Sequence, residues 1–263
     1  MAGCDGENGG TAAVDLDLAG RVYVVSGATR GLGFAAAREL VAEGARVVIS
    51  GRDAAAVAAA AEKLGGPAHA AGVAADNADP GVGDTLTGAA HREFGRLDGV
   101  LVSTGGPPTG TVLSVRDEQW TGAFESVFLG AVRIARSAAA ALGPGGVIAF
   151  VLSSSVKTPL SGLATSNGLR PGLAMVAKEL ADELGPAGIR VLGLLPGRIA
   201  TARADELDAG APGRREAAEA SIPLGRYGDP AEFGRVAAFL LSPAASYLTG
   251  LVVPVDGGML RSL

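Results

Sequence analysis

Short, unbroken runs of apolar residues alternate with longer alanine-rich stretches along most of this chain, and no other feature restricts its fold as strongly. Each run lacks the regular polar positions of a half-exposed strand, so it would be buried on both faces, as strands are in a parallel sheet covered by helices. Seven such runs occupy residues 22–26, 46–50, 68–74, 99–103, 147–153, 189–195 and 251–255. Six helical patterns occupy residues 32–43, 54–64, 83–94, 116–142, 168–184 and 231–241. The alternation predicts a single α/β domain, a doubly wound parallel sheet of about seven strands with helices on both faces.

Two segments fall outside this alternation. Residues 1–15 are polar and rich in glycine without any periodicity, which is typical of a disordered leader, so the domain is expected to span 16–263. Residues 201–226, rich in Ala, Glu and Arg, are expected to form a long irregular stretch. Because ligands of a doubly wound sheet bind beyond the carboxyl ends of its strands, this segment after the sixth strand is a candidate substrate lid.

Charge and composition exclude several classes of function. The net charge of −5 argues against a nucleic-acid partner, which usually selects a basic face. Cys4 is the one cysteine, and His69 and His91 lie far apart in the sequence, so neither a disulfide framework nor a metal site is expected. No apolar run approaches the ~18 residues that cross a bilayer, and the N-terminal residues do not resemble a signal peptide. We therefore expect a cytoplasmic protein with no membrane partner.

A glycine-rich turn follows the first predicted strand and leads directly into a helical pattern. Its glycines, Gly27, Gly31 and Gly33, would permit a tight turn and let backbone N–H groups approach a pyrophosphate at a helix N-terminus. A glycine-rich turn can also be only a turn. The position of this one, at the start of a βαβ unit, favours dinucleotide binding.

The Gly-x-x-x-Gly-x-Gly spacing resembles the fingerprint of the short-chain dehydrogenase/reductase (SDR) family rather than that of two-domain dehydrogenases. The resemblance extends through residues 97–106, 153–155, 185–191, 196–201 and 223–258, and so covers almost the whole chain after the leader. It implies a Rossmann fold that binds NAD(P). The residues that it assigns to cofactor binding are Gly27, Thr29, Arg30, Gly31, Leu32, Gly33, Arg52, Asp76, Asn77, Thr104, Gly105, Arg170, Pro196, Gly197, Ile199 and Thr201.

The residues after the second strand bear on which dinucleotide is bound. NAD-type members of the family usually carry an acid there, which bonds the ribose hydroxyls, whereas this chain has Arg52 followed by Asp53. Arg52 and Arg30 could both face a 2′-phosphate, whose geometry suits guanidinium groups. This favours NADP(H) over NAD(H), although Asp53 could cap the next helix and Arg30 could be a solvated loop residue. Asp76 and Asn77 stand where the family places an acid beside the adenine, with a simple loop turn as the alternative.

The family's catalytic residues are a Tyr-x-x-x-Lys pair, a Ser thirteen residues before the Tyr, and an Asn on an earlier helix. Aligned without a gap on the helix that follows, this chain has Ser166 in place of the Tyr and Arg170 in place of the Lys, while Ser153 matches the Ser. Alignment of the earlier helix puts Val127 where the Asn belongs. The pattern resembles an atypical, ketoacyl-reductase-like subgroup of the family that lacks the usual tetrad.

The substitutions change what the site can do. In the family a Tyr tuned toward neutral pH supplies a proton, and the Ser166 hydroxyl is far too weak an acid to replace it. Arg170 is always protonated, so it cannot donate a proton either, but it can hold a ribose hydroxyl or a phosphate and stabilise an oxyanion. We expect Ser153, Ser166 and Arg170 to form the catalytic site. Pro171 would then fall in the first turn of the helix over 168–184, where proline is tolerated.

Three further side chains are candidates for a functional role, and two of them also have a plain interpretation. Lys157, just past the fifth strand, could deliver a proton or be a solvated surface lysine. Asn167 could orient a substrate or pack at the start of a helix. Tyr227, which follows the candidate lid, could reach a bound substrate.

These features predict an NADP(H)-dependent oxidoreductase that acts on the carbonyl or alcohol of a small-molecule substrate, which the sequence does not identify. The alternatives are a dinucleotide-binding protein with a non-redox or regulatory role, or a structural partner that joins tetramers of active relatives. In the family, the helices corresponding to 116–142 and 168–184 pack against their symmetry mates, and both are alanine-rich here. A homotetramer, or else a homodimer, is therefore expected.

Overall fold

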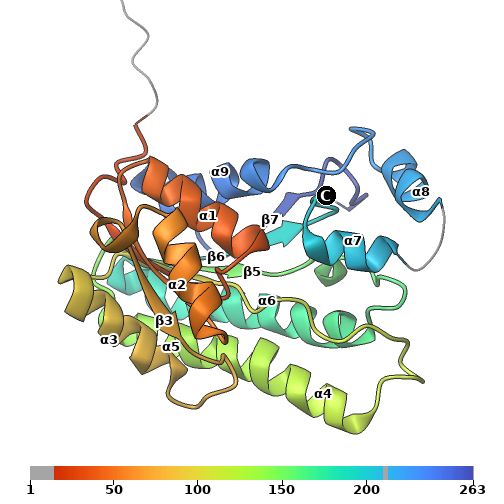
Figure 1. The fold of residues 1–263 in the computed structure, drawn as a ribbon, viewed down its shortest axis with the longest axis horizontal. Coiled ribbons are helices and arrows are strands. Elements are labelled where there is room, and N and C mark those ends of the chain that lie inside the picture. The colour runs from red at the N-terminus through yellow and green to blue at the C-terminus, as the bar shows by residue number, and fades with distance from the viewer. Residues whose placement is uncertain (1–14, 210–212, 263) are drawn as a thin grey trace, which may run out of the picture.

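Seven parallel strands form one sheet in the order β3-β2-β1-β4-β5-β6-β7 (Figure 1). The computed structural model describes residues 15–209 and 213–262. The strands are β1 Val22–Val25, β2 Arg46–Gly51, β3 Ala70–Ala74, β4 Gly99–Val102, β5 Val147–Val151, β6 Arg190–Pro196 and β7 Leu251–Val255. The predicted doubly wound α/β fold is confirmed. The strand order reverses between β1 and β4, and sheets of this kind bind their ligands at that point.

Helices cover both faces of the sheet (Figure 1). They are α1 Gly31–Ala42, α2 Ala54–Lys63, α3 Val82–Phe94, α4 Asp117–Ala123, α5 Gly130–Ala141, α6 Ala164–Leu184, α7 Ala202–Asp208, α8 Arg214–Ser221 and α9 Pro230–Leu241. On one face α1, α2 and α9 pack with Tyr23 and Val25, and on the other α3, α5 and α6 pack with Val22 and Val24. Successive side chains of β1 thus enter opposite cores, which explains why the strands are apolar at every position.

No helix in the described ranges is both long enough and apolar enough to span a membrane. Strand boundaries differ slightly from the prediction. β3 begins at Ala70 because Gly66–Ala68 form a 3₁₀ turn, and β5 ends at Val151 because Ser153 caps a second 3₁₀ turn, Ser154–Val156.

The helix predicted over 116–142 is interrupted. After α4, a π-helical turn occupies Phe124–Leu129, and α5 continues from Gly130. At Gly130 a Cβ atom would collide with the backbone carbonyl oxygen of Asn77, so the helix lies directly against the loop that follows β3. A π turn adds a residue without ending the helix, and such turns are frequent at functional sites.

α6 begins one turn earlier than predicted, which places Pro171 in the helix interior rather than in its first turn. The prediction was wrong because tertiary contacts hold the added residues. The hydroxyl of Thr165 donates to the carbonyl of Pro108 at 2.8 Å. Asn167 accepts the backbone N–H of Leu160 at 2.9 Å and donates to the carbonyl of the same residue at 2.8 Å. The Asn167 side chain therefore fixes the start of the helix, as its plain interpretation held.

The candidate lid is more regular than predicted, since α7 and α8 both lie within 201–226. Thr201 caps α7 by accepting the N–H of Ala204, a local signal that the composition of the segment concealed. Most of the predicted leader, residues 1–14, lies outside the described residues, and its disorder stays a prediction.

Candidate functional site

The loop between β1 and α1 is built for close approach to a ligand. Gly27 has φ +57°, and a Cβ there would collide with the carbonyl oxygen of Ser103. A Cβ at Gly33 would lie 2.7 Å from the carbonyl oxygen of Gly27. The hydroxyl of Ser26 donates to the Ser103 carbonyl and accepts the Ser103 N–H, both at 2.9 Å, so it fastens the ends of β1 and β4 together. The result is a tight turn whose backbone N–H groups and helix N-terminus can face an anion.

Two arginines stand beside this loop with their charges exposed. Arg30 is the N-cap residue of α1, and Arg52 follows β2. Neither guanidinium forms an ion pair with any carboxylate in the described part of the chain. Asp53, next to Arg52, instead accepts the N–H of Ala56 at 2.9 Å and caps α2, so the capping interpretation of Asp53 is confirmed.

The predicted adenine-side residues form a turn after β3. Asp76 is exposed and accepts the N–H of Ala78 at 3.0 Å. Asn77 lies deeper, and its side-chain amide donates to the Ser103 carbonyl at 3.5 Å. The structure thus brings Asn77, but not the Asp76 carboxylate, into contact with the phosphate-loop framework.

The segment after β6 reaches the same edge of the sheet. Pro196 ends β6, and a Cβ at Gly197 would lie 2.6 Å from the Cβ of Asp256, so the chain turns closely against the residue that follows β7. Ile199 is buried, and Thr201 begins α7. These four predicted cofactor residues, Pro196, Gly197, Ile199 and Thr201, therefore lead from the sheet edge directly into the lid.

Arg170 is the most confined charge in the site. Its side chain, only 5% exposed, donates from Nη1 to the carbonyl of Val151 and from Nη2 to Thr104 Oγ1 at 3.1 Å and the Gly105 carbonyl at 3.0 Å. Its Nε has no partner within the described residues. Burial lowers the pKa of Arg170 to about 10, so the group still carries a positive charge at neutral pH. A cation from α6 thus ties together the carboxyl ends of β4 and β5.

Three serines lie next to it, and their roles differ. Ser153 Oγ accepts the N–H of Ser155 at 3.1 Å, which leaves its own proton free to donate elsewhere. Ser166 is buried with its Oγ 3.1 Å from Ser155 Oγ. The sequence prediction missed Ser155, because the spacing of the family motif selects Ser153, the first serine of the run. The presence of three consecutive serines was the feature that could have indicated Ser155. The structure brings Ser155, not Ser153, to Ser166.

Sequence comparison identifies the framework that carries this arrangement. A family model described as enoyl-(acyl carrier protein) reductase matches residues 27–260. The L-rhamnose 1-dehydrogenase (NAD(P)(+)) of Azotobacter vinelandii is 38% identical over 259 residues, which are 94% of this chain and 99% of that protein. The chain belongs to the short-chain dehydrogenase/reductase family. The family resemblance seen in its motifs is confirmed.

Solved SDR structures agree with the fold throughout. A short-chain dehydrogenase/reductase from Brucella melitensis has a TM-score of 0.88 and 29% identity, covering 93% of this chain and 98% of that one. The L-sorbose reductase of Gluconobacter frateurii, complexed with NADPH and L-sorbose, has a TM-score of 0.84 and 30% identity, covering 95% and 100%. This SDR chain is accordingly an NAD(P)-dependent oxidoreductase by family, and that part of the predicted function is confirmed.

The residues present fit an SDR dinucleotide. No atom lies within 4 Å of the position that a Cβ at Gly31 would take, so space is open at the N-terminus of α1, and Arg170 places a positive charge at the carboxyl ends of β4 and β5. Within residues 15–209 and 213–262, no group of three His, Cys, Asp or Glu side chains is placed to hold a metal ion.

None of the three tyrosines of this SDR takes the place of the missing phenol. Tyr23 donates to the carbonyl of Leu241 in the core, where burial raises its pKa. The hydroxyl of Tyr227 donates to Asp208 at 3.0 Å, and Tyr247 is fully exposed. The suggestion that Tyr227 reaches a substrate therefore conflicts with its position. Val127, at the Asn position, is 2% exposed within the π turn and offers no polar atom.

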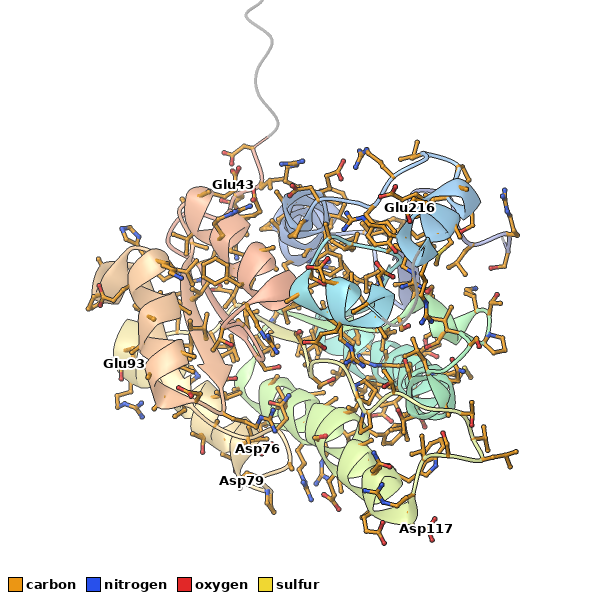
Figure 2. The ribbon with its side chains drawn as sticks, turned by 45° about the vertical axis from the view of Figure 1, so that its right-hand side comes forward. Glu43, Asp76, Asp79, Glu93, Asp117 and Glu216 are labelled. Carbon is orange, nitrogen blue, oxygen red and sulfur yellow. The ribbon has the colours of Figure 1, made fainter. Side chains whose placement is uncertain are left out.

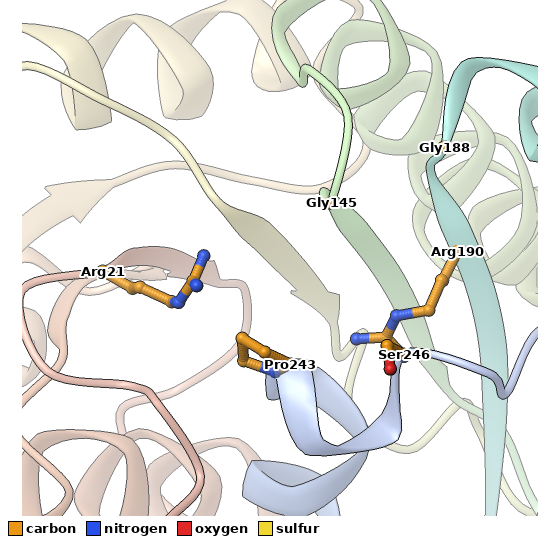
Figure 3. A pocket seen from close by; sticks show the side chains of 6 residues that line it. All are labelled: Arg21, Gly145, Gly188, Arg190, Pro243 and Ser246. Atoms are coloured by element: carbon orange, nitrogen blue, oxygen red, sulfur yellow. The ribbon is translucent and has the colours of Figure 1, made fainter.

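A hollow lies at the opposite end of this SDR sheet. Its volume is about 150 Å³, and Figure 3 shows its lining of Arg21, Gly145, Gly188, Arg190, Pro243 and Ser246. Arg190 there donates to the carbonyls of Leu240 and Ser242 at 2.8 and 3.0 Å, and so caps the end of α9. The hollow is at the amino ends of the strands, and its arginine has a structural role.

Proposed function

We propose that this chain is an NADP(H)-preferring oxidoreductase that interconverts a carbonyl and an alcohol with an atypical catalytic site. The observation that carries the proposal is Arg170, a buried cation with unused N–H groups at the carboxyl ends of β4 and β5. A positive charge fixed in a dry site is suited to stabilise negative charge that develops on a substrate oxygen.

Each residue has a definite part in this mechanism. When bound, the nicotinamide supplies the hydride, or accepts it in the reverse direction. Ser153 donates its free proton in a hydrogen bond to the substrate oxygen, and Arg170 stabilises the developing alkoxide. Ser166 and Ser155 form the adjoining polar wall. A water molecule or the exposed ammonium of Lys157 delivers the proton, since neither Ser166 nor Arg170 is a suitable acid near neutral pH.

The preference for NADP(H) is supported by Arg30 and Arg52, which are exposed and unpaired within the described residues beside the phosphate loop. Charge-assisted contacts of this kind favour a 2′-phosphate. The test is a thermal-shift titration with NADPH and NADH. We expect clear stabilisation by NADPH and less by NADH. Arg52→Gln should weaken NADPH binding about tenfold and leave NADH binding unchanged. Equal responses to both nucleotides would contradict the preference.

A second candidate function is dinucleotide binding without hydride transfer, as in a non-redox or regulatory protein. The observation that favours it is the absence of any tyrosine hydroxyl beside Ser166 in the described chain. The double variant Ser166→Tyr/Arg170→Lys separates the two functions. In a redox enzyme it should create or raise reductase activity on simple ketones. Intact NADPH binding with no cofactor turnover would favour the second candidate.

The remaining expectations are part of the same proposal. The domain begins near residue 16, α7 and α8 act as the substrate lid, and the protein is cytoplasmic and binds no nucleic acid. It assembles as a homotetramer or homodimer through α4, α5 and α6, where Phe124 and Met175 are 42% and 70% exposed. Exposed large apolar side chains of this kind often mark protein interfaces. Light scattering coupled to size exclusion measures the state, and a monomer at micromolar concentration would contradict the assembly.

A further inference from the structure

Two guanidinium groups meet one short loop of the site from different helices. The loop is Gly105–Gly106–Pro107, which follows β4. Arg170 from α6 donates to the Gly105 carbonyl at 3.0 Å, and Arg203 from α7 donates to the Pro107 carbonyl at 2.8 Å. The two accepting residues are two positions apart, so their carbonyls are separated by no more than about 7 Å. A substrate that lies against this loop between the two guanidinium groups would therefore be near both positive charges.

Arg203 has this position because Gly106 has no side chain. A Cβ at Gly106 would lie 2.7 Å from Arg203 Nε and 3.1 Å from its Cζ, so the guanidinium lies directly on the backbone of the loop. Within the described residues Arg203 forms one ion pair, with Glu206 at 3.2 Å, and the Glu206 side chain is 54% exposed. Pairs this exposed contribute little, so Glu206 leaves the Arg203 charge available to a stronger partner.

Two other arginines of the lid region, Arg215 and Arg198, are paired with carboxylates, whereas Arg214 is exposed on α8 and forms no ion pair among the described residues. Arg215 pairs with Asp205 at 3.5 Å and with Glu219 at 3.2 Å, and it also covers the ring of Tyr227. Arg198 pairs with Asp208 at 3.6 Å. The structure thus distinguishes Arg203 from its neighbours as the lid cation that faces the β4 loop.

The distribution of charge also leaves the buried cation Arg170 without a carboxylate partner. The chain has a net charge of −5. Figure 2 labels six carboxylates, and each is exposed and lies toward the outside of the molecule in that view: Glu43, Asp76, Asp79, Glu93, Asp117 and Glu216. Arg170, in contrast, is buried, and no carboxylate in the described chain pairs with it. A buried charge without a counter-charge is costly, and an anion bound beside it reduces that cost.

We infer that the substrate of this site carries a carboxylate next to the reacting carbon, as in a 2-oxo acid and the corresponding 2-hydroxy acid, and that Arg203 is the residue that selects it. The inference rests on the proposed oxidoreductase function and adds the substrate class. Three N–H groups of Arg170 are already used on Val151, Thr104 and Gly105. The planar fork of Arg203, whose side chain is partly exposed, matches the two oxygens of a carboxylate, and the buried charge of Arg170 adds to the positive potential at the loop.

The test compares phenylpyruvate with phenylacetone, which has a methyl group in place of the carboxylate. Binding is measured by thermal shift on protein saturated with NADP⁺, so that neither ketone can react, and turnover is measured separately with NADPH. For the unmodified protein we expect at least tenfold tighter binding of phenylpyruvate. Arg203→Gln should lower phenylpyruvate affinity about tenfold and leave phenylacetone unaffected, while Arg203→Lys should give an intermediate value because it keeps the charge without the fork.

Arg235→Gln is the matched control, because Arg235 is an exposed arginine of α9, outside the lid, and forms no ion pair among the described residues. It should leave both affinities unchanged. Equal binding of the two ketones, or an unchanged preference in Arg203→Gln, overturns the inference, while a retained shift with NADP⁺ leaves the proposed function standing. If the protein shows no shift with either NADP⁺ or NADPH, the proposed function itself fails, and the substrate class fails with it.

Discussion

The phosphate loop and the catalytic pocket lie at the same edge of the sheet, but they are built from different parts of the chain. In the phosphate loop the geometry comes from the backbone, because a side chain at Gly27 or Gly33 would collide with neighbouring backbone atoms. In the catalytic pocket the contacts come from side chains, chiefly Arg170 and the serines around it. A site built from backbone geometry tolerates few substitutions. A site built from side chains can acquire a different chemistry by substitution while the fold stays unchanged. The family pattern is accordingly kept in the first region and altered in the second.

The largest effect should come from Gly27→Ala. Its φ of +57° and the collision of a Cβ with the Ser103 carbonyl should destabilise the fold by about 3 kcal/mol and reduce NADPH affinity more than ~100-fold. Gly31→Ala is the control, since φ there is +62° but no atom lies within 4 Å of the Cβ position. It should cost only about 1–2 kcal/mol. Urea unfolding and NADPH titration measure both, and equal effects would show that strain, not space, restricts the loop.

On the catalytic side, Arg170→Met should lower kcat/KM about 100-fold by removing the fixed charge, with Arg170→Lys recovering part of the loss. The pKa of about 10 also sets a pH dependence. Below that pH the guanidinium is charged and the rate is supported; above it the charge and the rate decline together. The Met variant should lack this alkaline decline. A variant that retains activity within threefold would make Arg170 a purely structural link between β4 and β5.

Most of the fold could be predicted because it depends on local patterns. The apolar runs gave the seven strands, and the glycine spacing located the phosphate loop between β1 and α1. The interruption at Gly130 and the early start of α6 could not be predicted, because they depend on contacts with Asn77 and Pro108, which are distant in sequence, and on the side-chain bonds of Asn167 to Leu160. Where a helix begins was here decided by tertiary hydrogen bonds rather than by intrinsic propensity.

The candidate site divides in the same way. The glycines and the neighbouring arginines could be located from spacing alone, and the sequence already allowed Asp53 to cap the next helix. Spacing could not reveal that Arg170 donates hydrogen bonds to carbonyls at the ends of β4 and β5. Nor could it reveal that Ser155, rather than Ser153, lies within hydrogen-bond distance of Ser166. Both facts depend on rotamers and on the turn after β5, which a motif does not encode.

The two serines provide a finer test of the catalytic side. Ser153→Ala removes the proposed donor to the substrate oxygen and should lower kcat about tenfold. Ser155→Ala removes only the partner of Ser166, so the decrease should be about threefold and KM should stay the same. Steady-state kinetics on one substrate give both values. The reverse order would move the catalytic role from Ser153 to the Ser155–Ser166 pair.

The smallest effect is expected at the helix that supports the phosphate side. α9 packs closely on α1, since a Cβ at Gly234 would lie 2.7 Å from the Ala35 carbonyl oxygen. At the start of α9, Glu232 accepts from Arg226 at 2.7 and 2.8 Å and from the Asp229 N–H at 2.7 Å. The Arg226 hydrogen bonds, followed by the Asp229 N–H, lower the pKa of Glu232 from 4.5 to about 2.

Because the pKa of Glu232 is lower in the folded state, its contribution to stability is complete above pH 4.5 and is lost as the pH falls toward 2. Glu232→Gln should therefore unfold at a lower urea concentration than the unmodified protein at pH 7, and the difference should shrink at pH 3. Glu216→Gln removes an exposed carboxylate of α8 that forms no ion pair within the described residues, and it should change neither midpoint. A difference that persists undiminished at pH 3 would mean that Glu232 supports α9 through hydrogen bonds that a glutamine cannot make, rather than through its charge. The helix that supports the phosphate loop would then be held by hydrogen bonds and packing, and not by charge, even at its N-terminal end.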